Sequence, residues 1–171
     1  IISFYHLESF SHDKVGSADR RTKVQNALSY CMDTMSKMVA IANGNTDNPP
    51  IRLYPSPAGA TGFQVRVDLN DPQTPTDLSD DTWVFFTLAG NSLSIGGPTA
   101  EVLSSRILAN FNNSEMPTSP TDGFYVAIDS TGTVVDIGLV GRYDPSRAYD
   151  LVNNPQVSMK TRLICNNSST N

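Results

Sequence analysis

The first forty residues carry apolar side chains at helical spacing. From residue 24 onward these positions are separated by steps of three and four, which places them on one stripe of an α-helix. The stripe comprises Val24, Leu28, Cys31, Met35, Met38 and Ala42, and Ala27, Met32 and Val39 widen one flank. The pattern predicts a helix over residues 1–42 whose C-terminal half lies against a core. Asn43-Gly44, which suits a left-handed C-terminal cap, ends it.

The N-terminal half of this helix has a different pattern. Between Glu8 and Lys23 the residues are polar on most faces, and Val15 is nearly alone as an apolar side chain. At about 1.5 Å per residue, residues 1–42 would span roughly 60 Å, about twice the diameter of a small domain. We therefore expect a protruding helix whose first half lies in solvent or against another chain.

The rest of the chain is typical of β-strands separated by turns. Alternating apolar and polar residues mark half-buried strands at 63–69 and 157–163. Further strands are expected at 51–54, 82–88, 92–95, 101–111, 123–129 and 133–140, with hairpin turns at 89–91 and 130–132 and a frayed tail at 166–171. We predict an α+β fold in which a long N-terminal α-helix packs on one antiparallel β-sheet of about four to seven strands. Residues 43–171 would form its β-rich globular head.

Length and composition fit a single compact domain. The chain has 171 residues, 39% of them hydrophobic and 17% charged, with a net charge of −5. The charged fraction lies below the roughly 25% usual for soluble domains, which argues against a coiled coil or a charged disordered chain. The longest basic run is Arg20-Arg21. Because nucleic-acid-binding surfaces need clustered cations, we expect no nucleic-acid partner.

The sequence offers no convergent set of residues for hydrolytic chemistry. Its two histidines, His6 and His12, both lie on the protruding helix. Within Ser11-His12-Asp13, successive side chains point about 100° apart, so the three cannot hydrogen-bond in series. No glycine pattern of a phosphate-binding loop occurs. We predict that the chain is not an enzyme and has no cofactor.

Two acidic loops, 68–71 and 77–81, carry enough carboxylates for a cation such as calcium, although neither has the EF-hand spacing. Asp and Asn beside proline are also ordinary turn formers, so no metal site is assigned. The cysteines leave two alternatives open. Cys31 lies on the core-facing stripe and Cys165 follows the last strand, where it can pack back on the helix. They form either a Cys31–Cys165 disulfide or two buried thiols.

Two segments resemble bacterial type IV pilins and type II secretion pseudopilins. Residues 17–50, SADRRTKVQNALSYCMDTMSKMVAIANGNTDNPP, look like the helix and first turn of prepilin-type proteins of the PilW and GspJ-like kind. Residues 135–165 resemble their closing pair of strands, in which a final strand ends near an arginine. The resemblance implies an assembly interface at the end of an apolar half-helix, formed by Ile1, Ile2, Phe4, Tyr5, Leu7 and Phe10.

This resemblance implies a filament subunit outside a bacterial cell or in its periplasm and cell envelope. Its partners would be other pilin or pseudopilin subunits, and a segment upstream of Ile1 would hold it in the inner membrane before assembly. The apolar start without an initiator Met is typical of a chain whose upstream segment has been removed. Large apolar residues at the free end of a polar helix have no partner in their own domain, so packing between copies is the simplest arrangement.

A second interpretation is a secreted β-rich binding or adhesive module, for example one that binds carbohydrate. Trp83, with Phe85 and Phe86, would then form part of a ligand platform, because aromatic rings stack on sugars. The run Trp83-Val84-Phe85-Phe86 is apolar on both alternating faces, which fits a buried central strand better. Such a module also has no need of a projecting helix with an apolar end.

Overall fold

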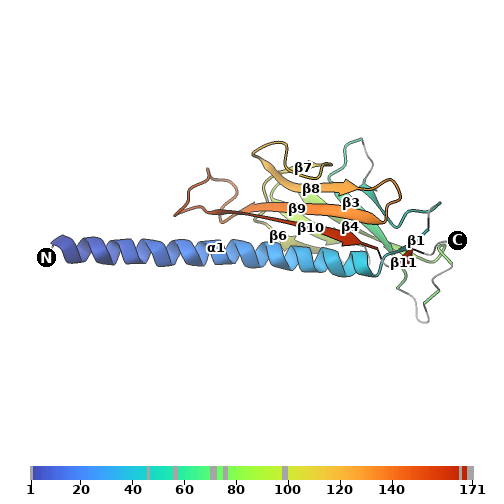
Figure 1. Cartoon of the computed structure of the whole chain (residues 1–171), viewed down its shortest axis with the longest axis horizontal. Helices are drawn as coiled ribbons and strands as arrows, with labels where there is room; N and C mark the ends of the chain where they lie inside the picture. The colour runs from blue at the N-terminus through green and yellow to red at the C-terminus, as the bar shows by residue number, and fades with distance from the viewer. Residues whose placement is uncertain are drawn as a thin grey trace.

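The computed structural model describes residues 2–45, 47–55, 58–69, 73–74, 77–97, 100–165 and 167–168; the side chains of 2–13 and 167–168 lie outside the description. Within these residues the chain forms one α-helix and eleven β-strands (Figure 1). The helix, α1, spans Ile2–Ala40. The strands are β1 (Asn43–Gly44), β2 (Ile51–Tyr54), β3 (Gly62–Val67), β4 (Thr82–Ala89), β5 (Ser92–Gly96), β6 (Glu101–Ser104), β7 (Asn110–Asn112), β8 (Asp122–Ile128), β9 (Val134–Arg142), β10 (Gln156–Ile164) and β11 (Asn167–Ser168).

The strands form two large sheets and one short pair. The first sheet has the order β2-β3-β4-β5-β6 and is antiparallel throughout. The second has the order β10-β9-β8-β7, and its β7–β8 pair is parallel. The prediction of one helix on a single antiparallel sheet is therefore wrong. In its described part, the chain is mostly β, with a single N-terminal helix and two larger sheets.

The sheets separate inside the segment 101–111, which the sequence predicts as one strand. β6 closes the first sheet and β7 begins at the edge of the second. Between them, Ile107 forms an isolated bridge with Gly141, and the Leu108 N–H donates to the Val140 carbonyl at 3.0 Å. Leu103, Ile107 and Leu108 are all buried. Their apolar character persists across the crossing, so the local pattern does not reveal where one sheet ends.

α1 packs against both sheets through one stripe of side chains. The fully buried members are Val24, Leu28, Cys31, Met35 and Val39. They share one core cluster with Phe63 and Phe86 of the first sheet and Phe124 of the second. The predicted core-facing stripe is confirmed, with one difference near the C-terminal end of the helix. Val39, predicted on the flank of the stripe, is buried, whereas Met38, predicted on the stripe itself, is only partly buried.

Aromatic side chains join the two sheets beneath the helix. The ring centroid of Phe63 lies 5.1 Å from that of Phe86 and 6.1 Å from that of Phe124. Phe111 meets Phe124 edge-on at 5.4 Å. The helix and both sheets therefore bury their apolar faces in one common core, as layered domains require.

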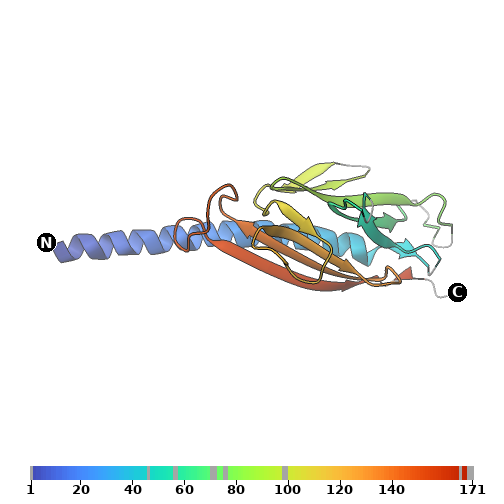
Figure 2. The same ribbon diagram turned by 90° about the horizontal axis from the view of Figure 1, so that it is seen from above.

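The C-terminal segment of the chain pairs with the residues that follow the C-terminal end of α1. Asn43–Gly44 pairs in parallel with Asn167–Ser168, so part of the segment expected to fray is hydrogen-bonded to β1. At the opposite end, α1 extends far beyond both sheets (Figures 1 and 2). Val15 is 67% exposed, and among the described side chains of the helix Val24 is the first that is buried.

We expect Leu28→Ala to lower the free energy of unfolding by about 2–5 kcal/mol, because it leaves a cavity where the helix meets the sheets. Gln25→Ala, at an exposed position of the same helix, is the control and should change stability by no more than about 0.5 kcal/mol. Urea denaturation measures both. A loss below about 1 kcal/mol for Leu28→Ala would contradict the packing of α1 in the core.

Candidate functional site

The predicted assembly residues lie on the projecting end of α1. The backbone of Ile2, Phe4, Tyr5, Leu7 and Phe10 is helical, whereas their side chains, and Ile1 altogether, lie outside the described residues. At about 1.5 Å per residue, Phe10 stands roughly 20 Å before the first core residue, Val24. The helix therefore holds these positions far from the core of their own head.

A loop of the head runs beside the helix where the projection begins. This loop, residues 143–155, connects β9 to β10. Ser17 Oγ donates to the Leu151 carbonyl at 3.1 Å, and Arg20 Nη1 donates to the Val152 carbonyl at 3.1 Å. The Asn154 amide donates to the carbonyls of three residues of the same loop, Asp144, Arg147 and Ala148. These bonds give the loop a defined shape next to α1.

The structure does not bring the two cysteines together. Cys165 Sγ donates to the Ala42 carbonyl at 3.1 Å. Cys31 lies about three helical turns before Ala42, on the order of 16 Å, whereas a disulfide needs Cα atoms within about 7 Å. Of the two alternatives, the structure therefore has two buried thiols and not the Cys31–Cys165 disulfide. Burial raises the pKa of the Cys31 thiol to about 12.

The acidic loops use their described carboxylates within the protein. Asp68 Oδ2 accepts from the Thr74 N–H at 2.5 Å, and Asp77 Oδ1 accepts from Ser79 Oγ at 2.6 Å. Asp81 Oδ2 lies 3.6 Å from Arg66 Nε. Among the residues that the structure describes, no three acidic, histidine or cysteine side chains gather as a metal site would require. Residues 70–72 and 75–76 lie outside that description.

The five-stranded sheet has an inner and an outer face, and β4 shows both. Val84, Phe86 and Leu88 point into the core, whereas Trp83 and Phe85 are half-buried on the outer face. The interpretation of this run as a strand buried on both faces is therefore wrong for Trp83 and Phe85. Phe86, the third residue of the hypothetical platform, is fully buried. The sequence of β4 alone could not show this, because the outer face is recognised by the polar residues that neighbouring strands place beside Trp83 and Phe85.

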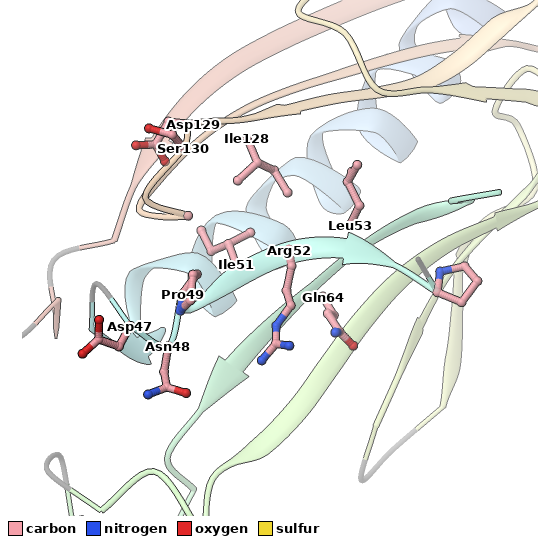
Figure 3. Close-up of a pocket in the computed structure, with 12 residues that line it drawn as sticks. Asp47, Asn48, Pro49, Ile51, Arg52, Leu53, Gln64, Ile128, Asp129 and Ser130 are labelled. Atoms are coloured by element: carbon pink, nitrogen blue, oxygen red, sulfur yellow. The ribbon is translucent and has the colours of Figure 1, made fainter. Parts of the chain in front are cut away.

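Two of these partners, Arg52 and Gln64, are directly opposite each other in the β2–β3 register, and Gln64 is opposite Phe85 in β3–β4. Figure 3 shows the two polar side chains on the same side of the sheet. The Arg52 guanidinium carbon lies 4.1 Å from the centroid of the Trp83 ring, a cation–π contact. A cation, an amide and aromatic rings thus share one surface.

A second aromatic contact extends this surface. The rings of Tyr54 and Phe85 stack with centroids 4.8 Å apart and planes at 12°. Phe85 lies opposite Gly96, and a Cβ at Gly96 would fall only 2.1 Å from the Phe85 ring. The ring therefore occupies the space that a side chain at position 96 would need.

Arg66, which is buried, also lies against Trp83. Its guanidinium carbon lies 5.4 Å from the Trp83 centroid, and it donates to the carbonyls of Asn43, at 3.1 Å, and Asn48. Burial lowers the pKa of Arg66 and raises the pKa of its ion-pair partner Asp81. The two charges are paired inside the protein, whereas Arg52 is exposed.

A hollow of about 560 Å³ opens at the edge strand β2 (Figure 3). Arg52 and Gln64 border it on the outer side of β2, whereas Ile51 and Leu53 point to the other side, toward Ile128 of β8. Asp129, in the turn after β8, also lines it. Burial acts to raise the pKa of Asp129, but hydrogen bonds from Thr131, Thr133 and Val134 outweigh it, and the pKa lies below its ordinary value. Asp129 therefore stabilises the turn, and a ligand in the hollow would meet the carboxylates of Asp47 and Asp129 as well as Arg52 and Gln64.

No family model, curated protein or solved structure matches the chain. Within the described residues, no helix is both long and apolar enough to cross a membrane. The geometry of the molecule is thus the basis for a functional proposal. It offers a projecting helix with an ordered loop beside it, and a sheet face that can stack on a ligand and hydrogen-bond to it.

We expect both cysteines to resist alkylation in the folded protein, because they are buried and, for Cys31, because the raised pKa leaves little thiolate at pH 8. Iodoacetamide should label neither residue in native buffer and both in 6 M guanidinium, as read by mass spectrometry. A linked peptide pair containing Cys31 and Cys165 in a non-reducing digest would contradict this arrangement.

Proposed function

We propose that this protein is a structural subunit of a bacterial filament, of the pilin, minor pilin or pseudopilin type, that assembles through its N-terminal helix. The observation that carries the proposal is the projection of α1. The helix has 39 residues, and only its C-terminal part belongs to the core of its own head. Because helices in proteins owe most of their stability to tertiary packing, the projecting part gains most from contact with another chain.

The apolar residues at the free end suit such packing. The positions of Ile2, Phe4, Tyr5, Leu7 and Phe10 do not share a single helical stripe but are spaced around several faces of the helix. A helix that is apolar on many sides is stable when it is surrounded, rather than when it lies on one surface. A bundle of such helices along a filament axis would surround each of them with copies from neighbouring subunits.

The loop beside the helix offers further contact surface. Tyr149, Leu151 and Val152 are 54%, 66% and 38% exposed, although the loop that carries them is fixed by Asn154, Ser17 and Arg20. Exposed apolar residues on an ordered loop are typical of a protein–protein contact. In the proposed filament, this loop would meet the helix or head of the next subunit.

The other parts of the proposal follow from assembly. The partners are further pilin or pseudopilin subunits, the location is an extracellular filament or the periplasm and cell envelope, and the role is structural rather than enzymatic. A segment before Ile1 would hold the subunit in the inner membrane until assembly. The resemblance of residues 17–50 and 135–165 to prepilin-type proteins supports this proposal. The two-sheet head does not oppose it, because assembly depends on the helix.

A secreted binding module is the second candidate function. The observation that favours it is the outward position of Trp83 and Phe85 beside Arg52 and Gln64. A binding module does not explain the projecting helix, and for this reason we place this function second. The two functions are compatible, since a filament subunit can carry a ligand-binding face on its head.

We expect the protein to be recovered in filaments sheared from the producing cells and labelled there by antibodies against the head. The double variant Leu7→Ser, Phe10→Ser should be absent from the sheared fraction, because it removes apolar surface from the helix end. The matched control is Ser9→Ala with Ser11→Ala, two polar positions of the same segment, which should assemble normally. Recovery of the unaltered protein only as a dispersed monomer, or normal assembly of the Leu7 and Phe10 variant, would contradict the proposal.

A further inference from the structure

Three exposed apolar side chains form the tip of the loop between β9 and β10. They are Tyr149, Leu151 and Val152, and we call them the loop tip. Ser17 and Arg20 of α1 donate to the carbonyls of Leu151 and Val152. The loop tip therefore stands beside the helix at the height where the helix begins to project from the head.

The position of the loop tip does not depend on its own side chains. Its contacts with α1 use the backbone carbonyls of Leu151 and Val152. The Asp150 carboxylate accepts from the N–H groups of Asn153, at 2.7 Å, and Val152, at 2.9 Å, and these bonds lower its pKa. A surface that is ordered before binding loses little conformational entropy when a partner covers it.

The projecting part of α1 offers apolar residues mainly near its free end. Between Ile2 and Lys23, every large apolar residue except Val15 lies at positions 2–10. These residues are Ile2, Phe4, Tyr5, Leu7 and Phe10. A loop tip that packs on the projecting helix of another copy therefore finds its apolar complement at residues 2–10.

The loop tip and residues 2–10 cannot meet within one molecule. Because α1 is continuous over Ile2–Ala40, Phe10 lies about 10 Å before Ser17 along the helix axis, and Phe4 lies about 24 Å before Arg20. Two complementary surfaces that are displaced along one axis join different copies head to tail. Such heterologous contacts build an open filament when the rotation between copies does not close a ring.

We propose that the loop tip of one molecule packs against residues 2–10 of α1 in a second copy of the chain. The two helices then lie side by side with an axial stagger of about 10–24 Å. The inference rests on the proposed function, because it assumes assembly through α1. It adds the identity of the neighbour, a second copy, and the part of the head that contacts the neighbour's helix.

A photo-reactive amino acid at position 151, introduced in the producing cells, tests this contact. We expect irradiation of the filaments to give dimers of this chain in which position 151 is joined to residues 2–10 of the second copy, as mapped by mass spectrometry. The same amino acid at position 102 is the control. Val102 is 60% exposed on the edge strand β6, and a probe there should not be joined to residues 2–10.

A double variant removes apolar surface from the loop tip without removing the backbone bonds that hold the loop. Tyr149→Ser with Leu151→Ser should lower the amount of protein in sheared filaments at least about fivefold, because the burial of two large side chains is lost. Val102→Ser with Ile164→Ser removes side chains of similar exposure from two strands of the head and should assemble normally. Unfolding midpoints show whether each variant is folded.

The outcomes separate this contact from the proposed function. Absence of the unaltered protein from sheared filaments would contradict the proposed function, and the contact with it. Protein that is present in filaments but forms no dimer through position 151, or is joined there only to a different protein, would overturn the contact alone. Normal assembly of the folded Tyr149 and Leu151 variant would overturn it as well.

Discussion

Burial of one helical stripe against two sheets is the constraint on which the rest of the structure depends. Each sheet has an apolar face that must be covered, and the side chains of Val24, Leu28, Cys31, Met35 and Val39 cover both where Phe63 and Phe124 bring the sheets together. The stripe fixes the direction of α1 along the head. Because the polar residues before Val24 offer little apolar surface to the sheets, the same constraint makes the first half of the helix project.

This arrangement also decides what each surface of the molecule can do. The helix and the second sheet use only the inner face of the first sheet, so the side of β4 that carries Trp83 and Phe85 stays open. Assembly and ligand binding can then occupy opposite parts of the molecule. The projecting end of α1 is the part that we propose for assembly, and the outer sheet face is the part that the second candidate function would use.

Local patterns predicted the local structure well. The helix, its buried stripe and the strands at 51–54, 82–88 and 92–95 follow from periodicity, because burial repeats every 3.6 or two residues. Contacts between residues far apart in the sequence could not be predicted from this periodicity. The segment 101–111 looks like one strand in the sequence, although it crosses from the first sheet to the second. The distance between Cys31 and Cys165 depends on the position of Cys165 beside Ala42, which the sequence does not show. Phe85 and Phe86 are alike in sequence, and only the sheet order shows which faces outward.

In a filament subunit of the kind we propose, the projecting end of α1 packs against the helices of neighbouring pilin-type subunits. A photo-reactive amino acid at position 7, introduced in the producing cells, tests this directly, because it captures whatever lies against that turn. We expect irradiation to join the protein to a neighbouring filament subunit, with the cross-linked peptide mapped to the N-terminal helix of a second copy or of another pilin-type protein. Irradiated protein that remains monomeric, or that is joined only to proteins other than pilin-type subunits, would contradict assembly through this helix.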